Sequence, residues 1–583
     1  MSIHTLPTEI LLKIFHLCFC STEKPPVLPD PYGKHSSTST HIHASASAFP
    51  PPHVCSLWRD TCSGSPKFYP TLSLQYTYED KDIKDIIPVS PLSRLCVFLE
   101  LTAPHPISVE FKITTSDLYE GNYLYDWYGS EEKVLAIGHA SGLVHLLKHC
   151  TRWRSATISI PYPLIPLFFP EETTFPRLRK LDLQISTSSS DGSDEKVGSL
   201  SRRLFGPASA PNLQVIVLEQ RVSRDTVLPW RSSAGIRNIQ VIILFDIYLK
   251  PEDMRAFSEC QNLHTIHFNS CTVLPSEDPT LPTPFHTLLP KVTHISSSRI
   301  LPSRYVRSTP LSFLTLPQLR SLQIQWNEGI EVEVMEFCER SSFSLEKLTL
   351  IQVQRGVYRP PTEQFLGLLT HLSGVDSINQ SLIELELNHT DAKWDVDEFR
   401  EVMEVLSLGR KISSSEDVAG PGPDEDAGDD QSTSAHDNSN MFPFLKQFTI
   451  AGYMLPDNTA FVSMIRSRCL HQHASMPSVA EQGLGITPIK SLLRGGGGLE
   501  ILRLRCPKST LTLETLAYFE TLVNKGLELY YDPWVGSSSR NLTIWRFPSY
   551  ECILHFSRHT IYAAWTGAPS TKFRKEECTG KSI

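Results

Sequence analysis

A short apolar pattern recurs along the chain and constrains its fold more than any other feature of the sequence. The pattern is Leu-x-x-φ-x-φ, in which φ is apolar and the last two apolar positions flank a single residue. In an extended strand such positions point to one side, and the residue between them points away. One strand leaves that side exposed, whereas stacked copies share a continuous core, so the pattern predicts an array of short parallel strands. Its nine copies, one of them degenerate, are Leu178/Leu181/Leu183, Leu213/Ile216/Leu218, Leu263/Ile266/Phe268, Val292/Ile295/Ser297, Leu319/Leu322/Ile324, Leu345/Leu348/Leu350, Leu382/Leu385/Leu387, Leu445/Phe448/Ile450 and Leu499/Leu502/Leu504.

The spacing of the copies predicts an irregular array. Their first positions lie 35, 50, 29, 27, 26, 37, 63 and 54 residues apart. The pattern resembles the leucine-rich repeat, whose period is about 20 to 29 residues, and the stretch from Leu263 to Leu345 comes nearest to it. Proline stands two residues before the first position in five copies, where it ends the preceding element and leads the chain into a strand. These prolines are Pro176, Pro211, Pro290, Pro317 and Pro443.

Helical candidates lie between several of the strand candidates, marked by N-terminal caps and by glycines at their ends. They are Pro251 to Cys260, Glu363 to Leu372, Trp394 to Leu408 and Leu513 to Lys525. Strands alternating with helices predict an α/β solenoid, in which parallel strands stack with helices and loops. The usual Asn or Cys, eight residues after the first Leu, occurs as Cys271 and Asn327 alone, so no regular ladder of such side chains is expected.

The solenoid is predicted to span residues 171–550, with a C-terminal tail over 551–583. Residues 411–440 interrupt it with eight acidic residues against Lys411 alone and almost no large apolar side chains. That composition predicts a disordered, solvated loop.

Residues 76–170 are expected to form atypical capping repeats or a linker, because the end of a stacked core must be closed off from water. Within them Ile107 to Ile113 and Trp153 to Ile160 alternate as strands do, and Lys133 to Leu147 has a helical pattern.

Two apolar clusters with helical spacing lie near the N-terminus. Pro7 suits the first position of a helix, and Glu9 in its first turn interacts favourably with the helix dipole. The apolar residues of this short helix make a wider surface than one small core needs, which favours docking to a partner. Between the clusters, residues 21–52 are rich in Pro, Ser and Thr and are expected to form a disordered insertion.

Together the clusters resemble the F-box, a small helical module that binds the Skp-type adaptor of cullin-RING ubiquitin ligases. The match is Leu-Pro-x-Glu-Ile-Leu-x-x-Ile-Phe from Leu6, then Val-Cys-x-x-Trp-Arg from Val54, and an apolar stretch over 68–74 that would close a domain of residues 1–75. Ser56 stands where the family usually has Arg or Lys, and the insertion lengthens the usual separation of the halves. With the repeat body, the chain resembles fungal F-box proteins that carry irregular leucine-rich repeats.

The resemblance implies a substrate-recognition subunit of an SCF-type ubiquitin ligase. Its F-box would bind the Skp-type adaptor and, through it, a cullin, while the repeat body binds an unidentified target protein. Such a subunit is not an enzyme and needs no cofactor or metal, and it works in the cytoplasm, the nucleus or both. The resemblance assigns adaptor binding to Leu6, Pro7, Ile10, Leu11, Ile14, Phe15, Val54, Cys55 and Trp58.

Two other hypotheses stay open. The chain would be a non-catalytic leucine-rich-repeat scaffold without ligase association if its N-terminal helices merely cap the solenoid. An enzymatic role has one group behind it, His145, His149 and Cys150, whose histidines have the spacing of zinc ligands on a helix. No HExxH pattern or matched cysteine pair completes a site with four ligands, so a half-buried helical face explains them better.

Composition narrows the class of protein further. The thirteen cysteines are scattered, which favours a reducing compartment over a secreted disulfide framework. The longest apolar runs, such as Ile239 to Leu249, are shorter than the ~20 residues of a membrane span, so a soluble protein without a membrane partner is expected. The net charge is -9, and no excess basic face suggests a nucleic-acid partner.

Overall fold

The computed structural model contains two compact units. Unit 1 comprises residues 1–319 and 336–342, and unit 2 comprises residues 320–335 and 343–583. The structure describes residues 40–41, 71–78, 95–96, 99–100, 102–115, 143–161, 165, 173–186, 209–221, 234–274, 285–298, 309–326, 330–352, 362–389, 396–407, 441–452, 458–474, 498–506, 511–525 and 527–531.

Unit 1 is built on a sheet whose described strands are parallel and follow chain order, except that β1 is antiparallel to β2. The strands are β1 (Thr40–His41), β2 (Thr71–Tyr78), β3 (Ile107–Thr115), β4 (Trp153–Pro161), β5 (Lys180–Ser186), β6 (Val215–Arg221), β7 (Val241–Phe245), β9 (Thr265–Asn269) and β12 (His294–Ser298). Short helices connect them, namely α5 (Leu143–Leu147), η7 (Cys150–Arg152), η9 (Ala234–Asn238), α8 (Pro251–Ala256), η10 (Phe257–Glu259) and η11 (Pro310–Phe313). Two further parallel pairs are β8 (Tyr248–Leu249) with β10 (Thr272–Val273) and β11 (Thr287–Leu288) with β13 (Leu314–Thr315).

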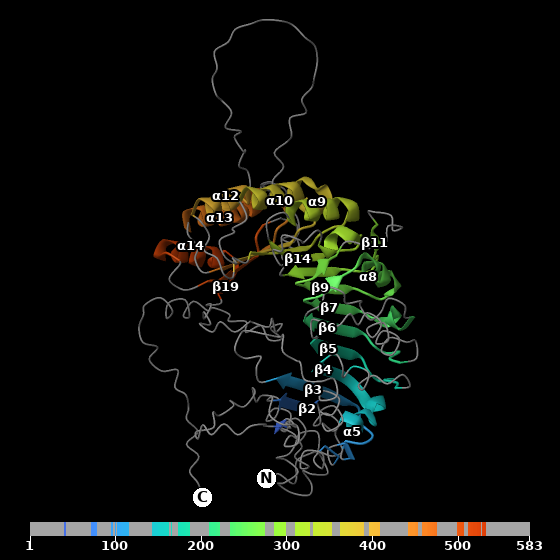
Figure 1. The fold of residues 1–583 in the computed structure, drawn as a ribbon. Coiled ribbons are helices and arrows are strands. Elements are labelled where there is room, and N and C mark those ends of the chain that lie inside the picture. The colour runs from blue at the N-terminus through green and yellow to red at the C-terminus, as the bar shows by residue number, and fades with distance from the viewer. Residues whose placement is uncertain are drawn as a thin grey trace, which may run out of the picture. The chain divides into compact units, whose positions relative to one another are not determined.

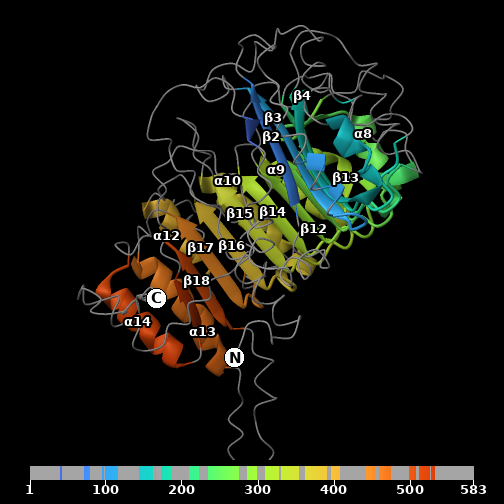
Figure 2. The same cartoon turned by 90° about the horizontal axis from the view of Figure 1, so that it is seen from below.

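Unit 2 has parallel strands in chain order, β14 (Ser321–Trp326), β15 (Lys347–Gln352), β16 (Glu384–His389), β17 (Gln447–Gly452), β18 (Ile501–Arg505) and β19 (Glu528–Tyr531). Its helices are α10 (Thr362–Gly374), α11 (Asp376–Asn379), α12 (Val396–Val405), α13 (Asn458–Ala474) and α14 (Leu513–Asn524), while α9 (Ile330–Ser341) contributes residues to both units. Figure 1 shows α10, α12 and α13 on one face of these strands, and Figure 2 shows β15 to β18 side by side.

All nine copies of the apolar pattern form strands with their pattern residues buried on one face. The register brings equivalent positions together, because Leu181 pairs with Ile216 in unit 1 and Leu348 pairs with Leu385 in unit 2. Each sheet therefore shares one core along its length. This α/β arrangement of parallel strands and helices is compatible with a solenoid-like repeat.

The pattern missed β7, a strand in the middle of the unit 1 sheet. β7 buries Ile242 and Leu244 and pairs in register with β6 and β9. Its first position is Ile239, an isoleucine where the pattern required leucine. Ile239 lies 26 residues after Leu213 and 24 residues before Leu263, so both intervals fall within the repeat period of about 20 to 29 residues. The predicted array was therefore wrong to place no repeat in the 50 residues between Leu213 and Leu263.

A tight turn precedes the strands and accounts for the prolines. The N–H of Leu178 donates to the carbonyl of Phe175, and the N–H of Leu213 donates to the carbonyl of Ala210, both at 3.1 Å. Proline thus takes the second position of a four-residue turn, where its fixed φ is favourable. The same bond occurs at Ile239, Leu263, Val292, Leu319 and Leu445.

A ladder of asparagine side chains links neighbouring repeats of unit 1. Each asparagine directly precedes the first apolar position and donates to a carbonyl of the previous turn. The bonds join Asn212, Asn238 and Asn262 to the carbonyls of Pro176, Pro211 and Arg237 at 2.6, 2.8 and 3.3 Å. A ladder of side-chain hydrogen bonds therefore exists, but its asparagines stand directly before the first apolar position and not eight residues after it.

The four predicted helices are found, with ends within three residues of those expected when η10 is counted as the continuation of α8, and β3 and β4 confirm the two upstream strands. Two long helices, α9 and α13, were not predicted. The start of α9 reads Glu331-Val332-Glu333-Val334, which alternates like a strand, and α13 buries Arg468 on its core side.

Several predicted boundaries fall near or outside the described residues. The F-box boundary at residue 75 lies inside β2, and α5 covers the end of the candidate helix Lys133 to Leu147. Apart from Thr40–His41, the insertion over 21–52 lies outside the described residues, as do the acidic loop 411–440 and the tail 551–583. Within the described ranges, no helix combines the length and apolar character needed to cross a membrane.

Candidate functional site

The nine residues that the F-box resemblance assigns to adaptor binding lie outside the described residues. They are Leu6, Pro7, Ile10, Leu11, Ile14, Phe15, Val54, Cys55 and Trp58. The candidate site that the structure does describe is the face of the unit 1 sheet opposite its core.

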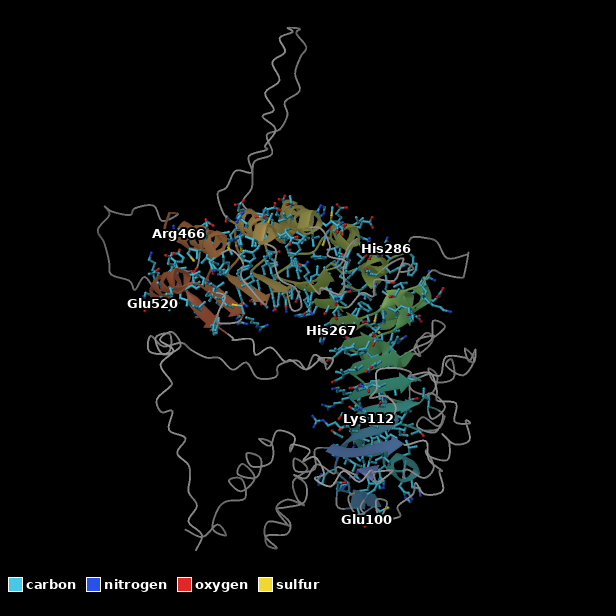
Figure 3. The ribbon with its side chains drawn as sticks, turned by 60° about the vertical axis from the view of Figure 1, so that its left-hand side comes forward. Glu100, Lys112, His267, His286, Arg466 and Glu520 are labelled. Carbon is cyan, nitrogen blue, oxygen red and sulfur yellow. The ribbon has the colours of Figure 1, made fainter. Side chains whose placement is uncertain are left out.

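This open face is formed by the strand residues that alternate with the buried ones. The register aligns them in three rows across β3, β4, β5, β6, β7, β9 and β12. Figure 3 labels two of them, Lys112 of β3 and His267 of β9. The rows are Ser108, Ser155, Lys180, Val215, Val241, Thr265 and His294; Glu110, Thr157, Asp182, Val217, Ile243, His267 and Ser296; and Lys112, Ser159, Gln184, Glu219, Phe245, Asn269 and Ser298.

An apolar patch occupies the middle of the open face. Its residues come from β6 and β7, whereas every other strand in the three rows carries polar or charged side chains there. The patch comprises Val215, Val217, Val241, Ile243 and Phe245, all partly exposed except Val217. Apolar groups gathered on one exposed face indicate a binding surface more often than scattered ones do.

Asp182 borders the apolar patch, because it pairs in register with Val217. The pKa of its carboxyl is raised to about 6, mainly by burial and also by the nearby Glu219 and Glu110, while Lys180 acts in the opposite direction. Among the described residues, Asp182 Oδ1 has no hydrogen-bond partner. Side chains whose pKa is shifted by burial and by neighbouring charges are frequent at functional sites, so Asp182 adds to the case for this part of the open face.

His267 lies on the other side of the patch, in register with Ile243. Burial lowers the pKa of its imidazole to about 4, and the neighbouring His294 lowers it too. His267 is therefore neutral at physiological pH, and it contributes polarity to the open face without contributing charge.

Four exposed cations gather where β4 and β5 begin. Arg154, Arg177, Arg179 and Lys180 are all exposed, and we refer to them as the basic edge. The N–H of Arg179, the residue before β5, donates to the carbonyl of Arg154 in β4 at 2.8 Å, so the two arginines are neighbours. Within the described part of the chain, none of the four forms an ion pair.

The open face of unit 2 differs because its charges are paired. Lys347 Nζ lies 2.7 Å from Glu384 Oε1, and Arg505 Nη1 lies 3.5 Å from Glu386 Oε1. Arg503 stacks 5.3 Å from the ring centre of Tyr530. These contacts occupy the charged groups of this face, which leaves unit 1 as the better candidate for binding.

The histidine and cysteine group proposed as an alternative metal site does not converge on a common point. Cys150 is buried and its thiol donates to the carbonyl of Thr174 at 3.5 Å, while burial raises its pKa. His149 Nδ1 lies 3.4 Å from Arg152 Nη1, a cation that disfavours a metal ion. No group of three or more metal-ligating side chains was found among the described residues.

Most of the described cysteines are buried, and Cys96 and Cys469 are partly exposed. They form no disulfide with one another, and burial raises the thiol pKa of Cys260, Cys271 and Cys338 to about 12. Such thiols stay protonated and unreactive near neutral pH.

Sequence reasoning missed both the apolar patch and the basic edge, although each has a signal. Residues 215–218 and 241–245 are continuously apolar where the other strands alternate, which marks strands with two apolar faces. The arginines recur as Arg152-x-Arg154 and Arg177-x-Arg179. No protein-family model and no curated protein matches the chain.

Proposed function

We propose that this chain is the substrate-recognition subunit of an SCF-type cullin-RING ubiquitin ligase, an F-box protein with an irregular leucine-rich-repeat body. The observation that carries the proposal is the order of its parts. Both halves of an F-box-like motif, from Leu6 and from Val54, precede an array of parallel strands with a shared core. That order separates a small docking module from a long surface that binds a target.

In this proposal the two N-terminal motif halves, from Leu6 and from Val54, bind the Skp-type adaptor, and the adaptor binds a cullin. The open face of unit 1 holds the target protein, with the apolar patch at its centre. Transfer of ubiquitin is carried out by other subunits, so the chain contributes affinity and position and makes no covalent bond.

Co-purification of the tagged full chain with a recombinant Skp-type adaptor tests the proposal. The wild-type chain should retain the adaptor, and the double substitution Leu11→Ala with Trp58→Ala should release it, since each anchor of such an interface contributes about 1 to 3 kcal/mol. Phe444→Ala is a matched control, because Phe444 is 46% exposed and belongs to unit 2. Failure of the wild-type chain to retain the adaptor would reject the proposal.

A scaffold without ligase association is the second candidate, and one observation favours it. β2 (Thr71–Tyr78) pairs in parallel with β3, and β1 (Thr40–His41) pairs with β2. Part of residues 1–75 therefore belongs to the sheet of unit 1. If these residues serve only as a cap, removing them should aggregate the chain by exposing the edge of β3, and light scattering of the truncated chain would detect this.

A further inference from the structure

Unit 2 contains a row of residues equivalent to the basic edge, and the two rows can be compared. The residue directly after the first apolar position of each repeat forms a row in each unit, because these residues are joined by backbone hydrogen bonds of 2.7 to 3.0 Å. In unit 1 the row is Arg154, Arg179, Gln214, Gln240, His264 and Thr293. In unit 2 it is Arg320, Glu346, Ile383, Lys446 and Glu500.

Among the described residues, the cations are paired with acidic residues in the row of unit 2 but not in the row of unit 1. In unit 2, Arg320 is 3.3 Å from Glu346, and Lys446 is 3.0 Å from Glu500, so each cation is followed by an acid. In unit 1, Arg154 is followed by Arg179. Like charges opposite each other on neighbouring strands destabilise a sheet, so the row of unit 1 carries a cost that the row of unit 2 avoids.

Two more cations add to the charge on this edge. Arg177 is near enough to Arg152 to lower its pKa, although burial contributes more to that shift. Arg152 is itself committed to the core, since its guanidinium donates to the carbonyls of His105 and Leu99 at 3.0 and 2.9 Å. Lys180 begins β5 and faces the same side as Asp182.

The basic edge continues into the apolar patch. Lys180 pairs in register with Val215, which pairs in turn with Val241. A ligand that neutralises the edge therefore meets apolar side chains within two strand spacings, about 10 Å.

We propose that the basic edge and the apolar patch bind one extended protein segment, with anionic groups against the arginines and apolar side chains against β6 and β7. Arginine binds carboxylates and phosphates through paired hydrogen bonds. An extended chain places alternate side chains about 6 to 7 Å apart on one side, which suits cations on neighbouring strands. The inference rests on the proposed function insofar as the segment belongs to the ligase target.

Fluorescence anisotropy of the full chain with labelled synthetic peptides tests the inference. Three peptides of about twelve residues share an apolar half of Leu, Val and Phe. Their other half carries Glu, phosphoserine or Lys. We expect the Glu or the phosphoserine peptide to bind at least about tenfold more tightly than the Lys peptide. The comparison between those two anionic peptides shows whether carboxylate or phosphate is the preferred group.

Paired substitutions locate the binding site. Arg154→Gln with Arg179→Gln should weaken binding of the anionic peptide roughly tenfold, whereas Arg320→Gln with Lys446→Gln removes two cations from the equivalent row and should change it less than about twofold. Gln already occupies the row at Gln214, so it fits the backbone there. Equal binding by the two double variants would overturn the inference.

Two further arms complete the test. Ile243→Ser should weaken binding of the peptide with the apolar half but leave a peptide of Glu and Ser unaffected. A single-stranded oligonucleotide that binds more tightly than every peptide would overturn the inference in favour of a nucleic-acid site. Adaptor co-purification of the wild-type chain separates the two proposals. A chain that retains the adaptor but binds the anionic peptide no more tightly than the Lys peptide rejects only this inference, and a chain that prefers the anionic peptide but does not retain the adaptor rejects only the ligase assignment.

Discussion

Arg468 on α13 offers the sharpest test of what holds unit 2 together. Its side chain is 1% exposed and donates to three backbone carbonyls. Nε reaches Leu406 O at 2.7 Å, Nη1 reaches Phe442 O at 3.0 Å and Nη2 reaches Met441 O at 2.8 Å. Burial lowers the pKa of the guanidinium to about 10, so it remains charged at neutral pH. The buried charge is thus stabilised by carbonyl groups at the end of α12 and in the turn before β17.

Arg468→Met removes the donors but keeps an apolar stem. All three carbonyls lose the bond from Arg468. Phe442 O keeps a bond from the N–H of Leu445 at 3.2 Å, so the carbonyls of Leu406 and Met441 carry the main cost. Each buried acceptor without a partner costs about 1 to 3 kcal/mol. Removing the buried charge returns part of that sum, so we expect unit 2 to lose about 3 kcal/mol.

Hydrogen exchange followed by mass spectrometry measures this loss locally. A change of about 3 kcal/mol corresponds to roughly a hundredfold faster exchange of the protected amides of α12 and β17, while β5 and β6 of unit 1 should be unaffected. Arg466→Met is the matched control on the same helix, because Arg466 is exposed and lies 5.1 Å from the ring centre of Tyr518. If the two variants exchange alike, the carbonyl contacts do not stabilise unit 2.

Three further predictions concern unit 1. The folded-state pKa of Asp182 is about 6 against an ordinary 3.8, so the stability of the fold should fall as pH rises from about 4 to 6. Asp182→Asn should remove this fall and add about 1 to 3 kcal/mol of stability above pH 6, as measured by urea denaturation at both ends of that range. A variant no more stable than wild type at pH 7 would contradict this prediction. Asn238→Ala removes one bond of the asparagine ladder and should cost about 0.5 to 1.5 kcal/mol in the same assay, an effect that Asn262→Ala, with its longer bond, should not exceed. Leu244→Ala empties a fully buried position of β7 and should cost about 2 to 5 kcal/mol; a loss below 1 kcal/mol would mean that β7 is not part of the core.

The sequence predicted the strands because burial in a stacked sheet requires the same periodicity wherever it occurs. Its failures have a common physical cause. Ile239 can replace leucine at the first apolar position of the repeat, because this position requires a large apolar side chain and not a particular branching pattern. α13 was missed because Arg468 sits on its buried side, where an apolar residue would have completed the helical pattern. Both errors came from reading residue identity where the structure requires a property of the side chain.

The asparagine ladder and the basic edge could not be predicted in the same way. Asn212, Asn238 and Asn262 gain their role from the turn before each strand, which aligns a side-chain amide with the carbonyl of the preceding repeat. Likewise, Arg154 and Arg179 become neighbours only when β4 and β5 pair in register. Contacts between repeats depend on the register, and the register is set by the packing of all the strands together.

The apolar patch shows how a departure from a local rule points to function. Parallel strands that are apolar on both faces are usually covered on both sides, and β6 and β7 have that composition. Ile242 and Leu244 are buried in the core, whereas Val241, Ile243 and Phe245 of the same strand remain partly exposed on the open face. Packing in the core accounts for the apolar character of Ile242 and Leu244 but not for that of Val241, Ile243 and Phe245. A strand of this composition gains stability when a second apolar layer covers its open face, and a bound target segment would supply that layer.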